Sequence, residues 1–444
     1  MPTHRTRTAV PLLASALAAA LLGATPALAA PAAPPAPNPP TATRHQVEAF
    51  TEDGTISRTT VPGASPFTAP PAPGIAPPKG DGDVTALVRN GAPADKLDVV
   101  VIGDGYTAEE QDRFRADAAE KWREITAVEP YATYRGLFNV WAVSAVSPES
   151  GVSGDPDQGT VRHTALGAYF WCDGVERLLC VDDKAVDRYA AKAPQADLVL
   201  VVANSAKYGG AGYNDLTSPL GYEGIATVAG GNARSGQIAV HETGHSLGKL
   251  ADEYAYDGQG TYQGAEPAEA NISTLTADRM REQGTKWSRW LGRTSPDGGT
   301  VGTYEGGGYY PAGLYRPTEN SIMRSLGREF NLPGREAMIA GFYRHATPLT
   351  SATPTDTWLT AADHLSVDLP VTGTRLRWYL DGRELTELRG RTALDLAAVR
   401  PSAHRPFPRL PYLLTAVATD PTPAVADPDL RENLTASLSW LVTL

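Results

Sequence analysis

The sequence is poor in cysteine, methionine and histidine: its 444 residues include two cysteines, four methionines and eight histidines. It also lacks an excess of positive charge, because 50 acidic residues outweigh 39 basic ones and give a formal net charge of -11. No cluster of Lys and Arg interrupts this balance, so nucleic acid is excluded as the expected partner. Hydrophobic and charged contents of 42% and 20% are ordinary for a folded, soluble protein.

Long apolar runs are absent except near the N-terminus. There, basic residues precede the stretch VPLLASALAAALLG, and small residues follow at Ala27 and Ala29. The run is shorter than the ~20 residues that a membrane span requires. The pattern therefore predicts a secretory signal peptide over residues 1–29, cleaved near Ala29. We expect an exported, extracellular protein that has no transmembrane span and acts as a monomer.

The two cysteines, Cys172 and Cys180, lie in WCDGVERLLC. In an oxidising compartment this spacing predicts one local disulfide. A metal-binding pair would need closer spacing and further ligands. Because no cysteine precedes Cys172, latency through a cysteine-bearing pro-peptide is excluded.

Composition divides the rest of the chain into three parts. Residues 30–84 are rich in Pro and Ala and contain one short alternating stretch around Asp53-Gly54, which predicts a β-hairpin. This part is a linker, a processed pro-segment or an attachment to the cell envelope. In residues 85–345, short apolar strands alternate with helical patterns, which indicates an α/β (α+β) domain. Residues 346–444 have strand patterns and turn residues, which predict a small β-sandwich.

The chemistry-bearing motif is HETGH, with His241 and His245 four residues apart and Glu242 between them. On a helix, this spacing brings both imidazoles to one face, where they can bind one Zn²⁺ ion. Glu242 lies beside them, in position to act as general base toward a water molecule. The motif predicts a metal-dependent hydrolase.

A catalytic zinc site needs a third protein ligand and one open position. In the metzincins a glycine at the place of Gly248 allows a sharp turn, and a third ligand follows three residues later; here that position holds Ala251, which cannot bind a metal. Asp252 and Glu253 come next. We favour Asp252 as the ligand, because it lies nearer the point where the chain returns, and Glu253 is then the alternative ligand or orients another ligand.

A second signal is Met323, in the tripeptide Ser-Ile-Met about eighty residues after the histidines. A methionine turn of this kind lies beneath the metal in metzincins. An isolated methionine is usually just a core residue, but together with HETGH this one predicts such a turn.

The stretches HETGHSLGKLADEY, GDGYTAEEQDRF, NVWAVSAVSPESGV and NSIMRSLGREFNLPGREAM make the chain resemble the IgA-peptidase family of zinc metallopeptidases, which are exported and related to the metzincins. The resemblance covers most of residues 85–345. It implies a zincin-like catalytic domain with an active-site helix and a Met-turn, and a zinc endopeptidase that cleaves protein or peptide substrates. In it His241 and His245 are metal ligands and Glu242 is the general base, the cluster from Asp252 to Tyr254 is part of the site, and Met323 matches the Met-turn.

Other roles stay open. Tyr309, Tyr310 and Tyr315 are candidates for stabilising the oxyanion of the reaction. The stretch GYEGIATVAG, residues 221–230, is expected to form an exposed strand that pairs with an extended substrate. The alternative function is a non-enzymatic protein that binds the envelope or a glycan and carries a structural or vestigial zinc site, which a fourth protein ligand would favour. A serine hydrolase is disfavoured by the lack of a G-x-S-x-G motif.

Overall fold

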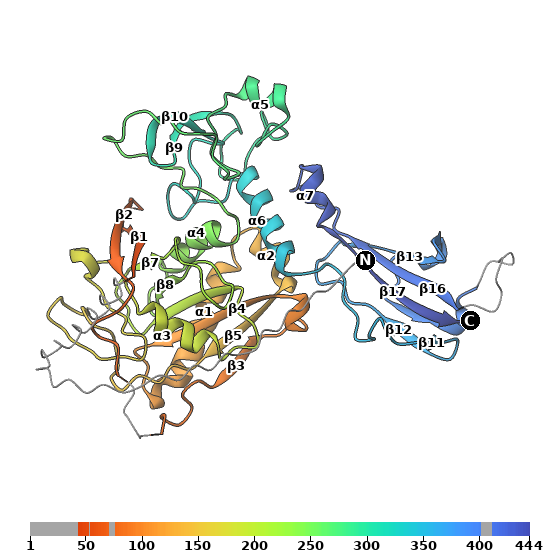
Figure 1. The fold of residues 1–444 in the computed structure, drawn as a ribbon, viewed down its shortest axis with the longest axis horizontal. Helices are drawn as coiled ribbons and strands as arrows, with labels where there is room; N and C mark the ends of the chain where they lie inside the picture. The colour runs from red at the N-terminus through yellow and green to blue at the C-terminus, as the bar shows by residue number, and fades with distance from the viewer. Residues whose placement is uncertain (1–42, 53, 71–75, 401–410) are drawn as a thin grey trace, which may run out of the picture. The chain divides into compact units, whose positions relative to one another are not determined.

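The computed structural model describes residues 43–52, 54–70, 76–400 and 411–444. The predicted signal peptide and most of the Pro/Ala tract lie outside them. The main body is built on a six-stranded sheet with strand order β3-β5-β4-β6-β8-β7 (Figure 1). Its strands are β3 (Val84–Val88), β4 (Leu97–Asp104), β5 (Phe138–Val143), β6 (Leu198–Ala203), β7 (Gly210–Gly212) and β8 (Ala226–Ala229).

Both faces of this sheet are covered. Strands β4, β5, β6 and β8 run parallel, and every residue of β4 is buried, as the continuous apolar sequence requires for a central parallel strand. Successive side chains of β4 point to opposite faces. On one face they pack with α1 (Gln111–Ile125), α2 (Tyr131–Tyr134), α4 (Gly236–Ser246) and α6 (Leu332–His345); on the other they pack with α3 (Asp183–Ala190). The predicted α/β arrangement is confirmed.

The sheet edge differs from the expectation. Within residues 221–230, β8 lies between β6 and β7, so it cannot pair with a substrate, and that prediction was wrong. The antiparallel edge strand is β7, the short segment Gly-Ala-Gly. Two glycines in three residues give no strand signal, because strand propensity reflects the packing of side chains that glycine lacks.

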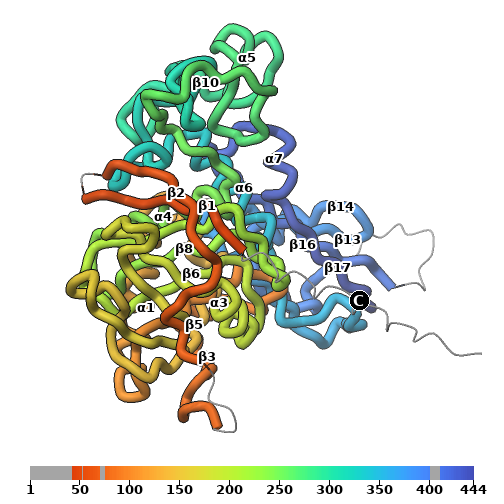
Figure 2. The backbone as a smooth tube through the Cα atoms, turned by 60° about the vertical axis from the view of Figure 1, so that its left-hand side comes forward, coloured from red at the N-terminus to blue at the C-terminus, as the bar shows by residue number. Residues whose placement is uncertain are grey.

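The N-terminal hairpin consists of β1 (Arg44–Phe50) and β2 (Ile56–Pro62), where it was predicted; Asp53 lies outside the described residues. An isolated antiparallel bridge joins Val47 to Tyr213, directly after β7. Because β1 alternates, Val47 and Ala49 pack into the core on the α3 face, whereas Phe50 packs into the core on the α4 face. The hairpin is therefore part of both cores, and it lies beside α4 (Figure 2).

One residue of the hairpin, His45, is held between two carboxylates. Its Nε2 lies 2.9 Å from Asp183 Oδ2, and its Nδ1 lies 3.1 Å from Asp215 Oδ1. The ring of Tyr213 packs edge-on against the imidazole. The hydrogen bond to Asp183, against the opposing effect of burial and with the help of Asp215, raises the pKa of His45 above its ordinary value.

We expect the substitution His45→Gln to lower the melting temperature more in mildly acidic than in alkaline solution. Since the folded-state pKa is raised, the interaction is fully present below the unfolded pKa of about 6.5 and is lost as the pH rises through the folded value. Thermal unfolding of wild type and variant at about pH 5.5 and about pH 9 measures the difference. His364→Gln, at an exposed histidine, is the control. An equal decrease in melting temperature at both pH values would contradict the raised pKa of His45.

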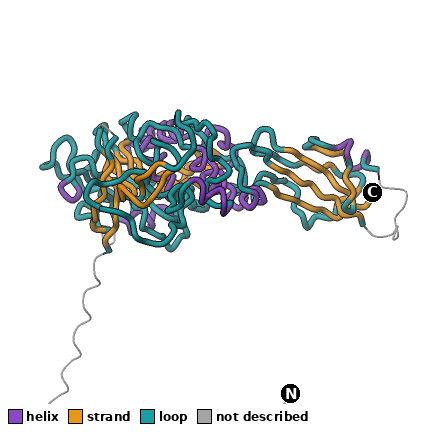
Figure 3. The backbone as a smooth tube through the Cα atoms, turned by 90° about the horizontal axis from the view of Figure 1, so that it is seen from above, coloured by secondary structure: helices purple, strands orange, loops and turns teal. Residues whose placement is uncertain are grey.

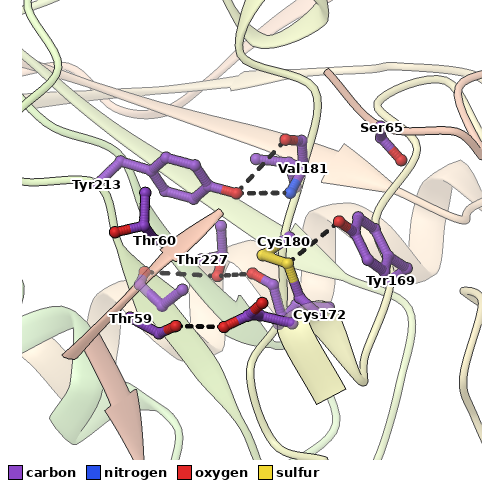
Figure 4. The surroundings of a disulfide bond; sticks show 12 residues. Thr59, Thr60, Ser65, Tyr169, Cys172, Cys180, Val181, Tyr213 and Thr227 are labelled. Atoms are coloured by element: carbon purple, nitrogen blue, oxygen red, sulfur yellow. Dashed lines mark hydrogen bonds between the residues drawn. A yellow bond between two sulfur atoms is a disulfide. The ribbon is translucent and has the colours of Figure 1, made fainter. Parts of the chain in front are cut away.

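The predicted disulfide between Cys172 and Cys180 is present. It closes a short loop that lies against the hairpin, and Figure 4 shows Thr59 and Thr60 of β2 beside the bond. The hydroxyl of Thr59 donates a hydrogen bond to Asp173 within that loop. The disulfide loop thus forms part of the surface on which the hairpin rests.

Between α4 and α6 the chain forms a smaller lobe around the buried rings of Trp287 and Trp290. It contains α5 (Ala277–Gln283) and the antiparallel pair β9 (Tyr304–Gly307) and β10 (Tyr310–Arg316). Among the described residues, no helix is both long enough and apolar enough to cross a bilayer.

After α6 the chain consists mainly of strands and loops (Figure 3). A five-stranded sheet has the order β11-β17-β16-β13-β14, and β12 pairs with β15. Both contribute to one core around Trp378 and Trp440. The elements are β11 (Leu359–Thr360), β12 (His364–Ser366), β13 (Arg375–Leu380), β14 (Arg383–Glu384), β15 (Ala393–Asp395), β16 (Tyr412–Thr419), α7 (Pro428–Glu432) and β17 (Thr435–Thr443).

A buried polar contact joins these strands to the body. The carboxylate of Asp420, directly after β16, accepts hydrogen bonds from the hydroxyls of Tyr134 and Tyr343, at 2.8 and 2.9 Å. Val425 and Leu434 belong to the same apolar core as α1 and α6. Residues on both sides of the predicted boundary at 345/346 therefore share a core.

Candidate metal centre

Helix α4 carries the two histidines of the motif. Its apolar residues Ile238, Ala239 and Val240 are buried against the sheet, which fixes the helix along β7 and β8. His241 and His245, one turn apart, consequently project from the same face. His241 is fully buried, and His245 is partly exposed.

Backbone carbonyls determine which ring nitrogens are free. Nδ1 of His241 lies 2.9 Å from the carbonyl oxygen of Ile322, and Nδ1 of His245 lies 2.7 Å from that of Leu250. A carbonyl only accepts hydrogen bonds, so each Nδ1 is the donor, and in the neutral ring the lone pair belongs to Nε2. The two Nε2 atoms face each other at 3.2 Å.

A carboxylate oxygen of Asp252 lies close to both of these Nε2 atoms. Its Oδ1 lies 3.3 Å from Nε2 of His241 and 3.4 Å from Nε2 of His245. The side chain is fully buried, and within the described part of the chain Oδ1 has no other polar partner. The other oxygen, Oδ2, accepts a hydrogen bond of 2.5 Å from the hydroxyl of Tyr309.

A fourth donor comes from the N-terminal hairpin. Oε2 of Glu48, in β1, lies 3.0 Å from Nε2 of His241 and 3.9 Å from Nε2 of His245. The Glu48 side chain is 3% exposed, and its Oε1 accepts a hydrogen bond from the Tyr254 hydroxyl. Sequence reasoning missed this residue, because no spacing rule connects it to a motif 193 positions away.

These four side chains fit a divalent cation. Their nearest donor atoms all lie within 4.8 Å of one another. Facing lone pairs on two imidazoles, beside two carboxylates, repel unless a positive charge lies between them. Burial would lower the pKa of His241, but the carboxylates of Asp252 and Glu48 outweigh this effect and raise that pKa to about 10. The two carboxylates thus favour a positive charge at this place. Two imidazoles and carboxylate oxygens are ligands that Zn²⁺ accepts.

Glu253, the alternative third ligand, faces a different set of partners. Its carboxylate accepts hydrogen bonds from the side chains of Asn271, Ser321 and Asn331, at 3.0, 2.8 and 2.9 Å. Burial raises its pKa. Of the two adjacent acids, the structure brings Asp252 to the histidines and Glu253 to this separate network.

The turn that separates these two acids from α4 differs from the expected one. The left-handed conformation, with φ of 50°, is taken by Lys249 rather than by Gly248. Gly248 instead allows close packing, since a Cβ there would lie 2.7 Å from both the Gly244 carbonyl and the Met338 sulfur. The glycine is needed for space, not for its backbone angle.

Glu242 is buried between α4 and the edge strand. Its Oε2 accepts a hydrogen bond of 2.9 Å from the Asn214 side chain, and its Oε1 is without a partner among the described residues. A Cβ at Gly212 of β7 would overlap the carboxylate, so only glycine fits there. Burial, followed by the charge of Glu48, raises the pKa of Glu242 to about 8.

Met323 lies beneath the same helix. The preceding residue, Ile322, accepts the hydrogen bond from His241, and the Met323 carbonyl accepts one from the Glu253 amide at 2.7 Å. Its sulfur packs against Gly244, where a Cβ would lie 2.5 Å from it. The turn thus supports both α4 and the segment that carries the acids.

We expect Gly244→Ala to destabilise the protein by about 1–3 kcal/mol, because the added methyl group must displace the Met323 sulfur in a packed core. Gly258→Ala, at a position where a Cβ meets nothing within 4 Å, is the matched control and should leave stability almost unchanged. Chemical denaturation of both variants measures the difference. Equal stability of the two would disprove the close packing of the turn under α4.

Of the three candidate tyrosines, the structure brings only Tyr309 to the cluster. The Tyr310 ring packs against Tyr262, and Tyr315 pairs through its backbone with Ser273. Beside His245 and Tyr309 lies a cavity of about 410 Å³. Its lining includes Asn214, Glu223, Lys249, Leu250 and Ile272.

A model of a known protein family matches this chain. The family model described as IgA Peptidase M64 matches residues 85–297 and 293–342, which together are more than half of the chain. No curated protein matches the chain. The matched region contains the histidine helix, both acids and Met323, and it begins after the hairpin that carries Glu48.

Proposed function

Because this chain belongs to the IgA peptidase M64 family and is thus a peptidase that acts on protein, we propose that it is a secreted zinc endopeptidase. His241, His245 and Asp252 would hold the ion. The observation that supports this most strongly is that the donor atoms of His241 and His245, on the helix that also carries Glu242, converge with that of Asp252 from the loop after it. The disulfide and the predicted signal peptide support export.

When bound, zinc supplies Lewis acidity that activates water and polarises a peptide carbonyl. Glu242 accepts the proton of the attacking water and then donates it to the departing amine, for which its place beside the two histidines on α4 suits it. Asn214 orients the Glu242 carboxylate through Oε2. Tyr309 donates its single hydroxyl proton to Asp252 and so holds that carboxylate in place; to stabilise the developing oxyanion it would have to turn this proton away from Asp252.

The shape of the site supports an extended substrate. At the edge strand β7, the backbone of Gly210 is already bonded to Arg177 and Leu179 of the disulfide loop, so a substrate could add a strand only from Gly212 onward. The cavity beside His245 has both acidic and basic residues in its lining, Glu223 and Lys249, as well as apolar ones, and would receive a substrate side chain.

One observation favours the alternative, a non-enzymatic protein with a structural zinc site. Glu48 completes a set of four protein donors, and structural zinc sites are closed in this way. Against it, Glu242 is unnecessary in a purely structural site. Glu48 also lies outside the region that matches the peptidase family.

Zinc content and cleavage of an unfolded protein, measured for wild type and Glu48→Ala, test the proposal. We expect about one zinc per chain in both, since three protein ligands suffice for a catalytic site. Cleavage by either form, abolished by a chelator and restored by zinc, supports an endopeptidase. Loss of zinc from Glu48→Ala without cleavage by either form would support the structural site instead.

A further inference from the structure

The N-terminal hairpin lies where a substrate would have to bind. Strand β1 runs antiparallel beside the edge of the sheet, joined to it by the bridge between Val47 and Tyr213. Because Gly210 is bonded to the disulfide loop, a peptide that adds a strand must do so at the Gly212–Tyr213 end of β7, which is the place that β1 occupies. The sheet has two edges, β7 and β3, and β7 is the one beside the candidate metal site.

Because side chains alternate along β1, one of them points at the candidate metal site formed by His241, His245 and Asp252. Val47 and Ala49 face the α3 side of the sheet, so Glu48 and Phe50 face the α4 side, where the histidines lie. The ring of Phe50 packs edge-on against His241, with ring centres 5.4 Å apart. Glu48 Oε2 is thereby placed among the Nε2 atoms and Asp252.

Catalysis by zinc requires one coordination position that is free for water or substrate. His241, His245 and Asp252 are three donors, and Glu48 is the fourth. With Glu48 in this position, a tetrahedral site has no place for the attacking water.

Contacts along the whole hairpin hold it in this place. The Gln46 amide donates a hydrogen bond of 2.9 Å to Asp215 Oδ2, and the Arg58 guanidinium of β2 lies 4.4 Å from the centre of the Tyr309 ring. Glu52 pairs with Arg177 at the far end. These contacts are polar and lie at the rim, whereas the buried apolar side chains of the hairpin anchor it in the two cores.

We propose that the hairpin of β1 and β2 is an inhibitory segment that keeps the peptidase latent, with Glu48 filling the open coordination position and β1 occupying the substrate's place along β7. This inference rests on the proposed function. It explains why the four-donor set is closed although the family region contributes only three of the donors. It also assigns residues 43–62 to the pro-segment among the three roles open for the Pro-rich region.

The test compares full-length wild type, Glu48→Ala and the control Ser57→Ala, which changes an exposed side chain of the same hairpin. We expect Glu48→Ala to cleave an unfolded protein at least about tenfold faster than wild type, because only molecules with an open position are active. Ser57→Ala should behave as wild type does. As a readout independent of activity, a chelator should remove zinc from Glu48→Ala about 10–100-fold faster.

The outcomes separate the two proposals. Equal rates of cleavage and of zinc removal in wild type and Glu48→Ala would overturn latency and leave the endopeptidase in place. Zinc bound by all three forms with no cleavage by any would overturn the endopeptidase, and latency with it. Glu48→Gln keeps the shape of the side chain but weakens its ligation, so it gives the same comparison if the alanine variant does not fold.

Discussion

Replacing Glu242 with glutamine is expected to lower the rate of peptide cleavage by about 10²–10⁴-fold, the usual contribution of a general base. Glutamine preserves the shape of the buried side chain and the contact with Asn214, but it cannot accept a proton. The measurement is the steady-state rate on an unfolded protein, in a chain that also carries Glu48→Ala so that the hairpin does not limit it.

The zinc content and the melting temperature of the variant must be measured together with its cleavage rate. Glu242 is not among the four converging donors, so the variant should bind as much zinc as its parent. Cleavage that persists at the parent's rate would remove Glu242 from the mechanism. Loss of zinc together with activity would instead mean that the carboxylate acts on the metal site itself.

The second large effect is expected at the two adjacent acids. Asp252→Asn should reduce zinc affinity by at least roughly 100-fold, since even groups that only orient a ligand contribute about 10–100-fold. The amide keeps the volume of the side chain and can still accept the hydrogen bond from Tyr309. Competition with a chromogenic chelator measures the affinity.

Glu253→Gln is the matched variant, one position further along. It should retain zinc close to the wild-type affinity but lose about 1–3 kcal/mol of stability, because its new amide group must face donors of Asn271, Ser321 or Asn331. The reverse pattern, with zinc lost in Glu253→Gln and kept in Asp252→Asn, would exchange the roles of the two acids.

The local part of the site could be predicted from the sequence. Two histidines at i and i+4 share a helix face whatever surrounds the helix. The acids after α4 were also within reach of local reasoning. Which of the two acids faces the histidines could not be predicted. It depends on the left-handed conformation of Lys249 and on the hydrogen bond between the Ala251 amide and Asn271, which no sequence spacing reveals.

The non-local part could not be predicted. Glu48 reaches the histidines only because β1 docks beside an edge strand more than 150 residues later in the chain. That edge strand, β7, has almost no side chains from which to recognise it. The hairpin itself was predictable from its alternation and turn, but its docking depends on tertiary packing that local propensity does not encode.

The buried carboxylate of Asp420 has a consequence for how this protein can be divided. Cutting the chain after α6 would leave two buried tyrosine hydroxyls without their acceptor and would expose the core positions that Val425 and Leu434 fill. The end of the family match at residue 342 is therefore not a boundary of independent folding. The peptidase body and the strands that follow it should denature as one cooperative unit, and a working recombinant fragment has to extend to the last strand.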